Sequence, residues 1–270
     1  MTTSANPTAA PNPTAAIVII GDEILSGRTI DTNVNTIAKF LAALGIDLME
    51  VRMVHDIEAQ IIAAVNAVRD PYDYVFTTGG IGPTHDDITA DCIAHAFQVD
   101  ISENPEALRL LEERAAKMGW ELNPNSRRMA RIPHGAELIK NPVSAAPGFQ
   151  IGNVFVMAGV PKIMTGMLED VAPRLRTGHK VLSRTIKLSY VGESWAADVL
   201  RAIDAKYDGL SLGSYPYGMT PGEFGTHLVV RGQDAAELAA AVNELVEALE
   251  PIVAESRTRN ALANFEEVTG

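Results

Sequence analysis

The 270-residue sequence has only one cysteine, Cys92, and this scarcity excludes two classes of site. One thiol can form neither a disulfide framework within the chain nor a metal site built from several thiolates. No pair of histidines has the H-x-x-x-H spacing of a zinc site, and no histidine spacing indicates a serine triad. The apolar neighbours Ile93 and Ala94 predict that Cys92 is a buried structural residue.

Positive charge is also scarce. The 22 Lys and Arg residues face 34 Asp and Glu residues, which gives a formal charge of −12 and a pI near 4.9. Because nucleic acids and anionic membranes are bound by basic surfaces, we expect neither as a partner. No run approaches the ~20 apolar residues that cross a bilayer. The first residues lack a signal peptide's basic start and apolar core, so we expect a cytoplasmic protein.

Apolar runs alternate with segments of helical periodicity in the first half of the chain. Strands are predicted at 15–20, 47–54 and 74–77, and helices at 33–44 and 57–68. This β-α-β-α-β order predicts an α/β fold with a doubly wound, mostly parallel sheet. Further helices are predicted at 88–97, 105–118 and 162–175, and further strands at 136–139, 148–151 and 153–157.

The pattern changes after residue 177, and a second, smaller α+β domain is predicted there. Its elements are expected at 185–190, 194–205, 210–215, 226–231 and 235–253. The predicted organisation is a disordered, proline-containing tail (1–14), the α/β domain (15–177), the small domain (178–255) and a C-terminal tail (256–270).

Polar clusters directly follow three predicted strands of the first domain. They are Gly21-Asp22-Glu23, His55-Asp56 and the glycine-rich segment 79–87. Ligands of such sheets bind beyond the carboxyl ends of the strands, so we expect the three clusters to face one crevice.

The segment TTGGIGPTHDDIT, residues 77–89, carries the clearest functional signal. Backbone N–H groups around Gly79, Gly80 and Gly82 can hold a phosphate, while Asp86 or Asp87 binds a divalent cation. Alternatively, the segment is a tight turn in which one aspartate caps the following helix. Two carboxylates aimed at a phosphate would repel it without a cation, so the functional interpretation implies a metal, with Mg²⁺ expected.

A dense basic cluster at Arg127, Arg128 and Arg131 has two interpretations. These guanidinium groups can clamp phosphate oxygens, or they can form a solvated helix face.

Several motifs together resemble a known family. They are GDEILSG (21–27), DTN (31–33), TTGGIGPTHDDIT (77–89), NPVSAAPGF (141–149), GVP (159–161), GES (192–194) and SYP (214–216). Their order and spacing are similar to those of the molybdopterin-binding domain of molybdenum-cofactor biosynthesis, and within it to the amino-terminal part of the competence/damage-inducible protein A group.

The resemblance implies a three-layer α/β domain that binds pterin or nucleotide phosphates, together with the small domain. It implies catalytic roles for Asp56, Asp86 and Asp87 and a metal held by Asp22, Asp56 and Asp87. The implied residues for binding molybdopterin or a nucleotide are Gly21, Asp22, Glu23, Asn33, Thr78, Gly79, Gly80, Gly82, Pro83, Thr84, Ser144, Gly148, Gly159 and Pro161.

The resemblance also implies an activity, which is metal-dependent cleavage of ADP-ribose at its pyrophosphate. The alternatives are adenylyl transfer to molybdopterin and binding of the pterin or nucleotide without turnover. Relatives assemble as dimers or trimers, so a homo-oligomer is expected. Full-length members carry a nicotinamide-mononucleotide deamidase domain, and this chain is expected to end before it.

The sequence departs from the usual pattern of the group at five positions. Ser144 and Ala145 replace Gly-Thr, Ala158 replaces a proline, Ile163 replaces an acidic residue and Met129 stands in place of a glutamine. These changes are expected to weaken or redirect ligand binding.

Overall fold

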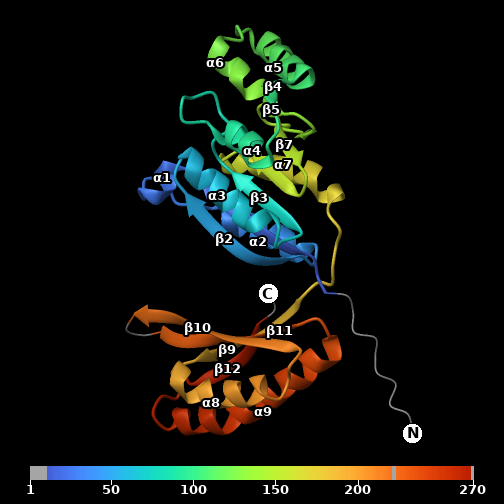
Figure 1. Cartoon of the computed structure of the whole chain (residues 1–270). Helices are drawn as coiled ribbons and strands as arrows, with labels where there is room; N and C mark the ends of the chain where they lie inside the picture. The colour runs from blue at the N-terminus through green and yellow to red at the C-terminus, as the bar shows by residue number, and fades with distance from the viewer. Residues whose placement is uncertain (1–10, 221–222, 269–270) are drawn as a thin grey trace, which may run out of the picture. The chain divides into compact units, whose positions relative to one another are not determined.

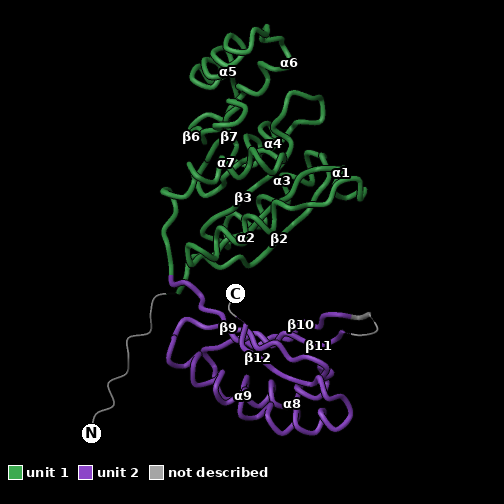
Figure 2. The backbone as a smooth tube through the Cα atoms, turned by 180° about the vertical axis from the view of Figure 1, so that it is seen from behind, with its two compact units in different colours: residues 1–178 green, residues 179–270 purple. Residues whose placement is uncertain are grey.

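The chain forms two compact units, residues 1–178 and 179–270 (Figure 2). The structure is a computed structural model that describes residues 11–220 and 223–268. Most of the tail expected at 1–14 therefore lies outside the described residues. Its end is folded, because Asn12 and Pro13 are buried and the Asp47 N–H donates to the Pro13 carbonyl oxygen over 2.9 Å.

A six-stranded sheet in the order β2-β1-β3-β8-β7-β6 forms the centre of the first unit (Figure 1). The first four strands in this order are parallel, whereas β7 is antiparallel to β8 and to β6. The strands are β1 Thr14–Ile20, β2 Asp47–Val54, β3 Tyr74–Thr78, β6 Glu137–Ile139, β7 Gly148–Ile151 and β8 Val154–Met157. The mostly parallel sheet expected from the apolar runs is confirmed.

Helices cover both faces of this sheet because its central strands are apolar on both sides. Along β1, Ala16, Val18 and Ile20 pack against α3 and α4, and the alternate residues pack against α2 and α7. The four helices are α2 Asn33–Ala43, α3 Glu58–Arg69, α4 Thr89–Phe97 and α7 Pro161–Val171. The expected three-layer α/β architecture is present.

A smaller group of elements extends the unit beyond α4, and the sequence predicted only one of them, α5 Pro105–Met118. The others are the short helix α6 Pro124–Arg127, a 3-10 turn at Arg128–Ala130 and an antiparallel pair, β4 Ile101–Glu103 and β5 Arg131–Pro133. This pair joins segments about 30 residues apart, so no local pattern signals it.

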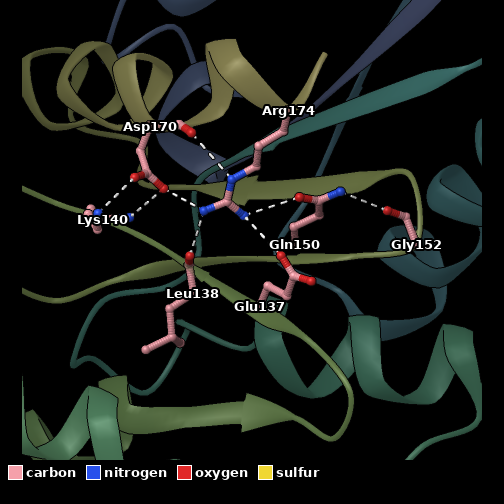
Figure 3. Close-up of polar contacts among 7 residues, drawn as sticks. All are labelled: Glu137, Leu138, Lys140, Gln150, Gly152, Asp170 and Arg174. Atoms are coloured by element: carbon pink, nitrogen blue, oxygen red, sulfur yellow. Dashed lines mark hydrogen bonds and ion pairs between the residues drawn. The ribbon is translucent and has the colours of Figure 1, made fainter. Parts of the chain in front are cut away.

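Arg174 connects three elements at the end of the sheet that carries β6 (Figure 3). It lies in the 3-10 turn Ala172–Arg174 after α7, and its guanidinium donates to the Leu138 carbonyl oxygen (2.8 Å), Gln150 Oε1 (3.1 Å) and Asp170 Oδ2. The side chains of Arg174 and Asp170 are only 22% and 17% exposed. The network therefore fixes β6, which leads into the loop 141–147.

We expect Arg174→Ala to lower the free energy of unfolding of the first unit by about 1–3 kcal/mol, because several half-buried acceptors lose their donor. Arg174→Lys is the matched control, since it keeps the charge but not the planar set of donors, and it should recover only part of the loss. Urea unfolding of the full chain measures both. Equal stability of Arg174→Ala and the wild type would contradict the assigned role.

The second unit is a four-stranded antiparallel sheet, ordered β10-β11-β9-β12, with two helices (Figure 1). Its elements are β9 Leu182–Ser189, α8 Glu193–Asp204, β10 Leu210–Thr220, β11 Glu223–Gly232, α9 Ala235–Arg257 and β12 Asn264–Val268. The expectation of a C-terminal tail from residue 256 is wrong, because α9 continues to Arg257 and β12 pairs with β9. The smaller domain therefore includes most of that segment.

None of the helices within residues 11–220 and 223–268 combines the length and the hydrophobicity of a transmembrane span.

Candidate functional site

A cavity of about 550 Å³ opens at the carboxyl edge of β1, β3 and β8. Asp56, which follows β2, and Asp87, which follows the glycine turn, both line it. Residues from all three polar clusters therefore lie around one cavity, as expected from the order of the strands. The expected site residues that line this cavity are Gly21, Glu23, Asp56, Gly79, Gly80, Gly82, Pro83, Thr84, Asp86, Asp87, Ser144, Gly159 and Pro161.

Four other expected site residues do not line the cavity. Asn33 is buried and donates from Nδ2 to the Gly159 carbonyl oxygen over 2.7 Å, so it positions a loop that does line it. Thr78 is buried in β3, and Gly148 lies where a Cβ would come within 2.3 Å of the Val156 carbonyl oxygen. Asp22 lines a neighbouring hollow that shares Glu23, Asp56 and Asp86 with the main cavity.

The glycine turn takes a shape that only glycine allows at two positions. Gly79 and Gly80 have positive φ angles of 107° and 65°. A Cβ at Gly79 would lie 2.0 Å from the Ile20 carbonyl oxygen, and one at Gly80 would lie 2.2 Å from Thr89 Oγ1. Thr89, buried at the start of α4, donates from Oγ1 to the Gly79 carbonyl oxygen and from its N–H to the Gly80 carbonyl oxygen, each over 3.0 Å.

The turn leaves consecutive backbone donors available to a ligand. The Gly79 N–H donates to the Met157 carbonyl oxygen over 3.2 Å. Among the described residues, none accepts a hydrogen bond from the N–H groups of Gly80, Ile81 or Gly82, which lie in the wall of the cavity. Successive donors of this kind form a concave site for anions.

Asp87 is held against the turn. Its Oδ2 accepts hydrogen bonds from the Thr84 N–H (2.8 Å) and from the Thr84 hydroxyl, and a Cβ at Gly82 would lie 2.7 Å from the same oxygen. The alternative in which an aspartate caps the next helix is wrong, because α4 has Ile88 at its N-cap and no side-chain cap. The two aspartates belong to the loop and the cavity.

Asp22 and Asp56 hold each other in place through reciprocal backbone contacts. The Asp22 N–H donates to Asp56 Oδ2 over 2.9 Å, and the Asp56 N–H donates to Asp22 Oδ1 over 3.3 Å. His55 Nδ1 lies 2.8 Å from the same Asp22 oxygen. The hydrogen bond with His55, followed by that from the Asp56 N–H, holds the pKa of Asp22 below its ordinary value.

The opposite shift affects Asp56. Burial raises the pKa of the Asp56 carboxyl, and the negative charges of Asp22, Glu23 and Asp86 add to the rise, against the lowering by the Asp22 N–H. Asp86 keeps its charge more readily, because the nearby Thr84 side chain and its own backbone N–H lower its pKa. Ionised Asp56 is thus destabilised by its surroundings in the absence of a cation.

The acidic groups are compatible with a cation that brings further ligands. Within residues 11–220 and 223–268, no three His, Cys, Asp or Glu side chains lie close enough to hold a metal ion alone. Asp22, Asp56 and Asp87 therefore do not form a complete metal site by themselves. Mg²⁺ typically binds one or two carboxylates together with substrate phosphates and water, and the cavity offers such a partial set.

Two basic residues of the expected clamp have other partners. Arg127 contacts Glu103 and Arg131 contacts Asp91. Arg128 contacts the loop directly, since its Nη1 donates to the Thr84 carbonyl oxygen over 3.4 Å, and both Arg128 and Arg131 line a small hollow beside Gly80 and Asp87. Cys92 is buried as expected, and burial raises the pKa of its thiol to about 12.

Sequence reasoning missed the positioning roles of Thr89 and His55 and the lining role of Asn141. Asn141 donates from Nδ2 to Ser144 Oγ (2.6 Å) and to the Ala146 carbonyl oxygen (2.8 Å), which shapes the loop before β7. Asn141 opens a quoted motif, so a signal existed. Thr89 closes another quoted motif and contacts glycines of that same motif, whereas His55 acts through a contact with the distant residue Asp22.

The chain matches the family model described as "Probable molybdopterin binding domain" over residues 16–177. The chain belongs to this family. Residues 180–258 match a second model, "FAD synthase, middle domain".

Relatives refine the assignment to the CinA amino-terminal type. A CinA-like protein of Anaeromyxobacter dehalogenans is 34% identical over 239 residues, which cover 85% of this chain and 58% of the relative. The crystal structure of the protein CinA with unknown function from Thermoplasma acidophilum has 32% identity and a TM-score of 0.56, and covers 61% of this chain and 99% of that chain. The chain spans about half to three fifths of the length of the CinA-like relatives it matches.

Four of the five departures from the usual pattern lie in the cavity wall, namely Met129, Ser144, Ala158 and Ile163. Two of them, Met129 and Ile163, make the cavity wall more apolar than glutamine and an acidic residue would. The fifth, Ala145, adopts a positive φ of 67°, a conformation that is uncommon for residues other than glycine.

We expect Asp56→Asn to raise the melting temperature at pH 7 in the presence of a chelator. A carboxyl whose pKa is raised by folding contributes stability at low pH that is lost as the pH rises through its folded-state pKa. Asparagine avoids that loss and still accepts the Asp22 N–H. The gain should disappear as the pH falls to about 4, the ordinary range of an aspartate pKa.

Asp22→Asn is the matched control, because its pKa shift has the opposite direction. A lowered pKa contributes stability above the unfolded-state value, so this variant should melt at a lower temperature than the wild type at pH 7. Melting curves between pH 4 and 8 measure both effects. Shifts of the same sign in the two variants would contradict the electrostatic description.

Proposed function

We propose that this chain is a metal-dependent pyrophosphatase that acts on ADP-ribose-like nucleotide diphosphates. One observation carries the proposal: four carboxylates line the cavity, Glu23, Asp56, Asp86 and Asp87, and none of the described lining residues is Lys, Arg or His. A diphosphate would be repelled there unless a divalent cation accompanies it. The N–H groups of the glycine turn in the same wall, which have no acceptor among the described residues, favour phosphate as the bound group.

Asp56 and Asp87 are the residues best placed to hold the cation, with Asp22 as a further candidate. Each of the first two lies against the glycine turn, since a Cβ at Gly80 would lie 3.6 Å from Asp56 Oδ1 and one at Gly82 would lie 2.7 Å from Asp87 Oδ2. When bound, a divalent ion neutralises phosphate charge and lowers the pKa of a bound water.

The other roles belong to the chain's own groups. The N–H groups of Gly80, Ile81 and Gly82 donate to oxygens of the phosphoryl group under attack, where negative charge develops. The oxygen of a water molecule bonds to phosphorus while the bridging P–O bond breaks, which gives AMP and ribose 5-phosphate from ADP-ribose. Thr84 and Asp87 keep the turn in its shape through their mutual hydrogen bonds.

We expect the purified chain to hydrolyse ADP-ribose with Mg²⁺, Mn²⁺ or Co²⁺ and to lose this activity in a chelator. Asp87→Ala and Asp87→Asn should both lower kcat/KM by about 100-fold or more, since about 3 kcal/mol of charge stabilisation corresponds to that factor. Chromatographic detection of AMP measures the reaction.

The asparagine variant separates charge from loop shape, because its amide oxygen still accepts the hydrogen bonds from Thr84. Thr84→Val, which removes only the hydroxyl donor, should cost far less activity than Asp87→Asn. Full activity of Asp87→Asn would remove the carboxylate charge from the mechanism. Absence of turnover with every metal would reject the pyrophosphatase.

Adenylyl transfer to molybdopterin is the second candidate, favoured by the family match over residues 16–177. It uses the same cavity but requires ATP and pterin together. Adenylylated pterin formed from the two substrates would establish it in place of hydrolysis. Tight binding of nucleotide or pterin without any product would instead identify a binding protein that lacks turnover.

A further inference from the structure

The strand β2 is an open edge of the six-stranded sheet, and its exposed side is apolar. Met49, Val51 and Met53 alternate along it and are 60%, 42% and 39% exposed. An edge strand presents unpaired N–H and C=O groups, and native proteins usually protect such edges with proline, lysine or a covering segment. β2 contains neither proline nor lysine over its eight residues, although the β1–β2 ladder has a register shift at Met49.

The strand is also self-complementary about its centre. In an antiparallel pair centred on Val51, residues whose numbers add up to 102 face each other. Met49 then faces Met53, Glu50 faces Arg52, and Leu48 faces Val54. Every pair across the axis is therefore either apolar with apolar or acidic with basic.

The charged pair is already ordered in one copy. Arg52 Nε donates to Glu50 Oε1 over 2.6 Å, and the Tyr72 hydroxyl donates to Glu50 Oε2 over 2.9 Å. These two hydrogen bonds, with that from Tyr72 first, lower the pKa of Glu50 and keep it charged. The side chains of Arg52 and Glu50 remain 38% and 32% exposed, so both can reach a second chain.

We propose that β2 pairs antiparallel with β2 of a second copy of this chain, on a two-fold axis through Val51. The two sheets become one continuous sheet, in which Met49 packs on Met53 of the partner subunit and Glu50 contacts Arg52 of the partner subunit. A two-fold axis requires the same patch to complement itself, and this sequence satisfies the requirement.

A second copy fits this edge better than an unrelated peptide does. A peptide needs open backbone groups and pockets, but it does not require the strand to complement its own reversed sequence. Charge gives a second reason. Two chains of net charge −12 repel each other, and β2 offers them a locally balanced contact in which each acidic group meets a basic one.

Sedimentation equilibrium of the full chain tests the proposal. We expect the wild type to be a dimer. Val51→Lys and Arg52→Glu should each raise the dissociation constant of the dimer at least roughly tenfold, because like charges then face each other across the strands. The double variant Glu50→Arg/Arg52→Glu restores opposite charges across the axis and should recover much of the affinity. Melting curves must show each variant folded.

A cysteine scan tests the register directly, because the native Cys92 is buried. Val51→Cys lies on the axis and should form an intermolecular disulfide under mild oxidation. Met49→Cys is more exposed but would lie about 13 Å from its own copy, so it should not cross-link.

Three results would overturn the proposal. They are a monomer at all concentrations, a dimer unaffected by Val51→Lys, and equal cross-linking at positions 49 and 51. None of them bears on hydrolysis, which is measured separately.

Discussion

The close approach of three backbone segments at the carboxyl edge of the central strands is the constraint on which the site depends. A Cβ at Gly79 would lie 2.0 Å from the Ile20 carbonyl oxygen, and one at Gly159 would lie 3.2 Å from the Gly79 Cα. Side chains at these positions would push apart the ends of β1, β3 and β8. Glycine permits the contact, and the turn after β3 then forms part of the cavity wall.

Several carboxylates lie beside that turn, and their surroundings stabilise the charge of some of them but not of others. His55 lies against Asp22, and Thr84 donates to Asp87, but burial and three acidic neighbours act against the charge of Asp56. A carboxylate placed at such a cost is characteristic of a site that is completed by a cation or a ligand rather than of a region selected for stability. The reciprocal N–H contacts with Asp22 keep Asp56 in position despite the repulsion.

The sequence predicted the helices and strands whose ends are marked by nearby residues. β2, β7 and α5 begin and end where the sequence indicated, because the apolar runs and the Asn104 cap with Pro105 mark them. β12 was missed because it is stabilised by pairing with β9, about 80 residues earlier, and its own residues are mostly exposed. Similarly, the glycine-rich segment predicted a binding site from local sequence alone. The contact between His55 and Asp22 could not be predicted in this way, because it forms only when the ends of β1 and β2 meet.

The departures at Met129 and Ile163 make the cavity wall more apolar than the usual family pattern would. Met129, Ala158 and Ile163 replace polar, rigid or acidic groups, and all three line the same cavity as the carboxylates. Loss of an acidic side chain at position 163 removes repulsion of a phosphate without touching the turn or Asp56. Added apolar surface favours a flat ring, since burying a ring against methyl and thioether groups releases water. These substitutions leave the glycine turn and Asp56 unchanged and alter another part of the cavity wall. Under the proposed function, we therefore expect them to change ligand selectivity rather than to abolish the site.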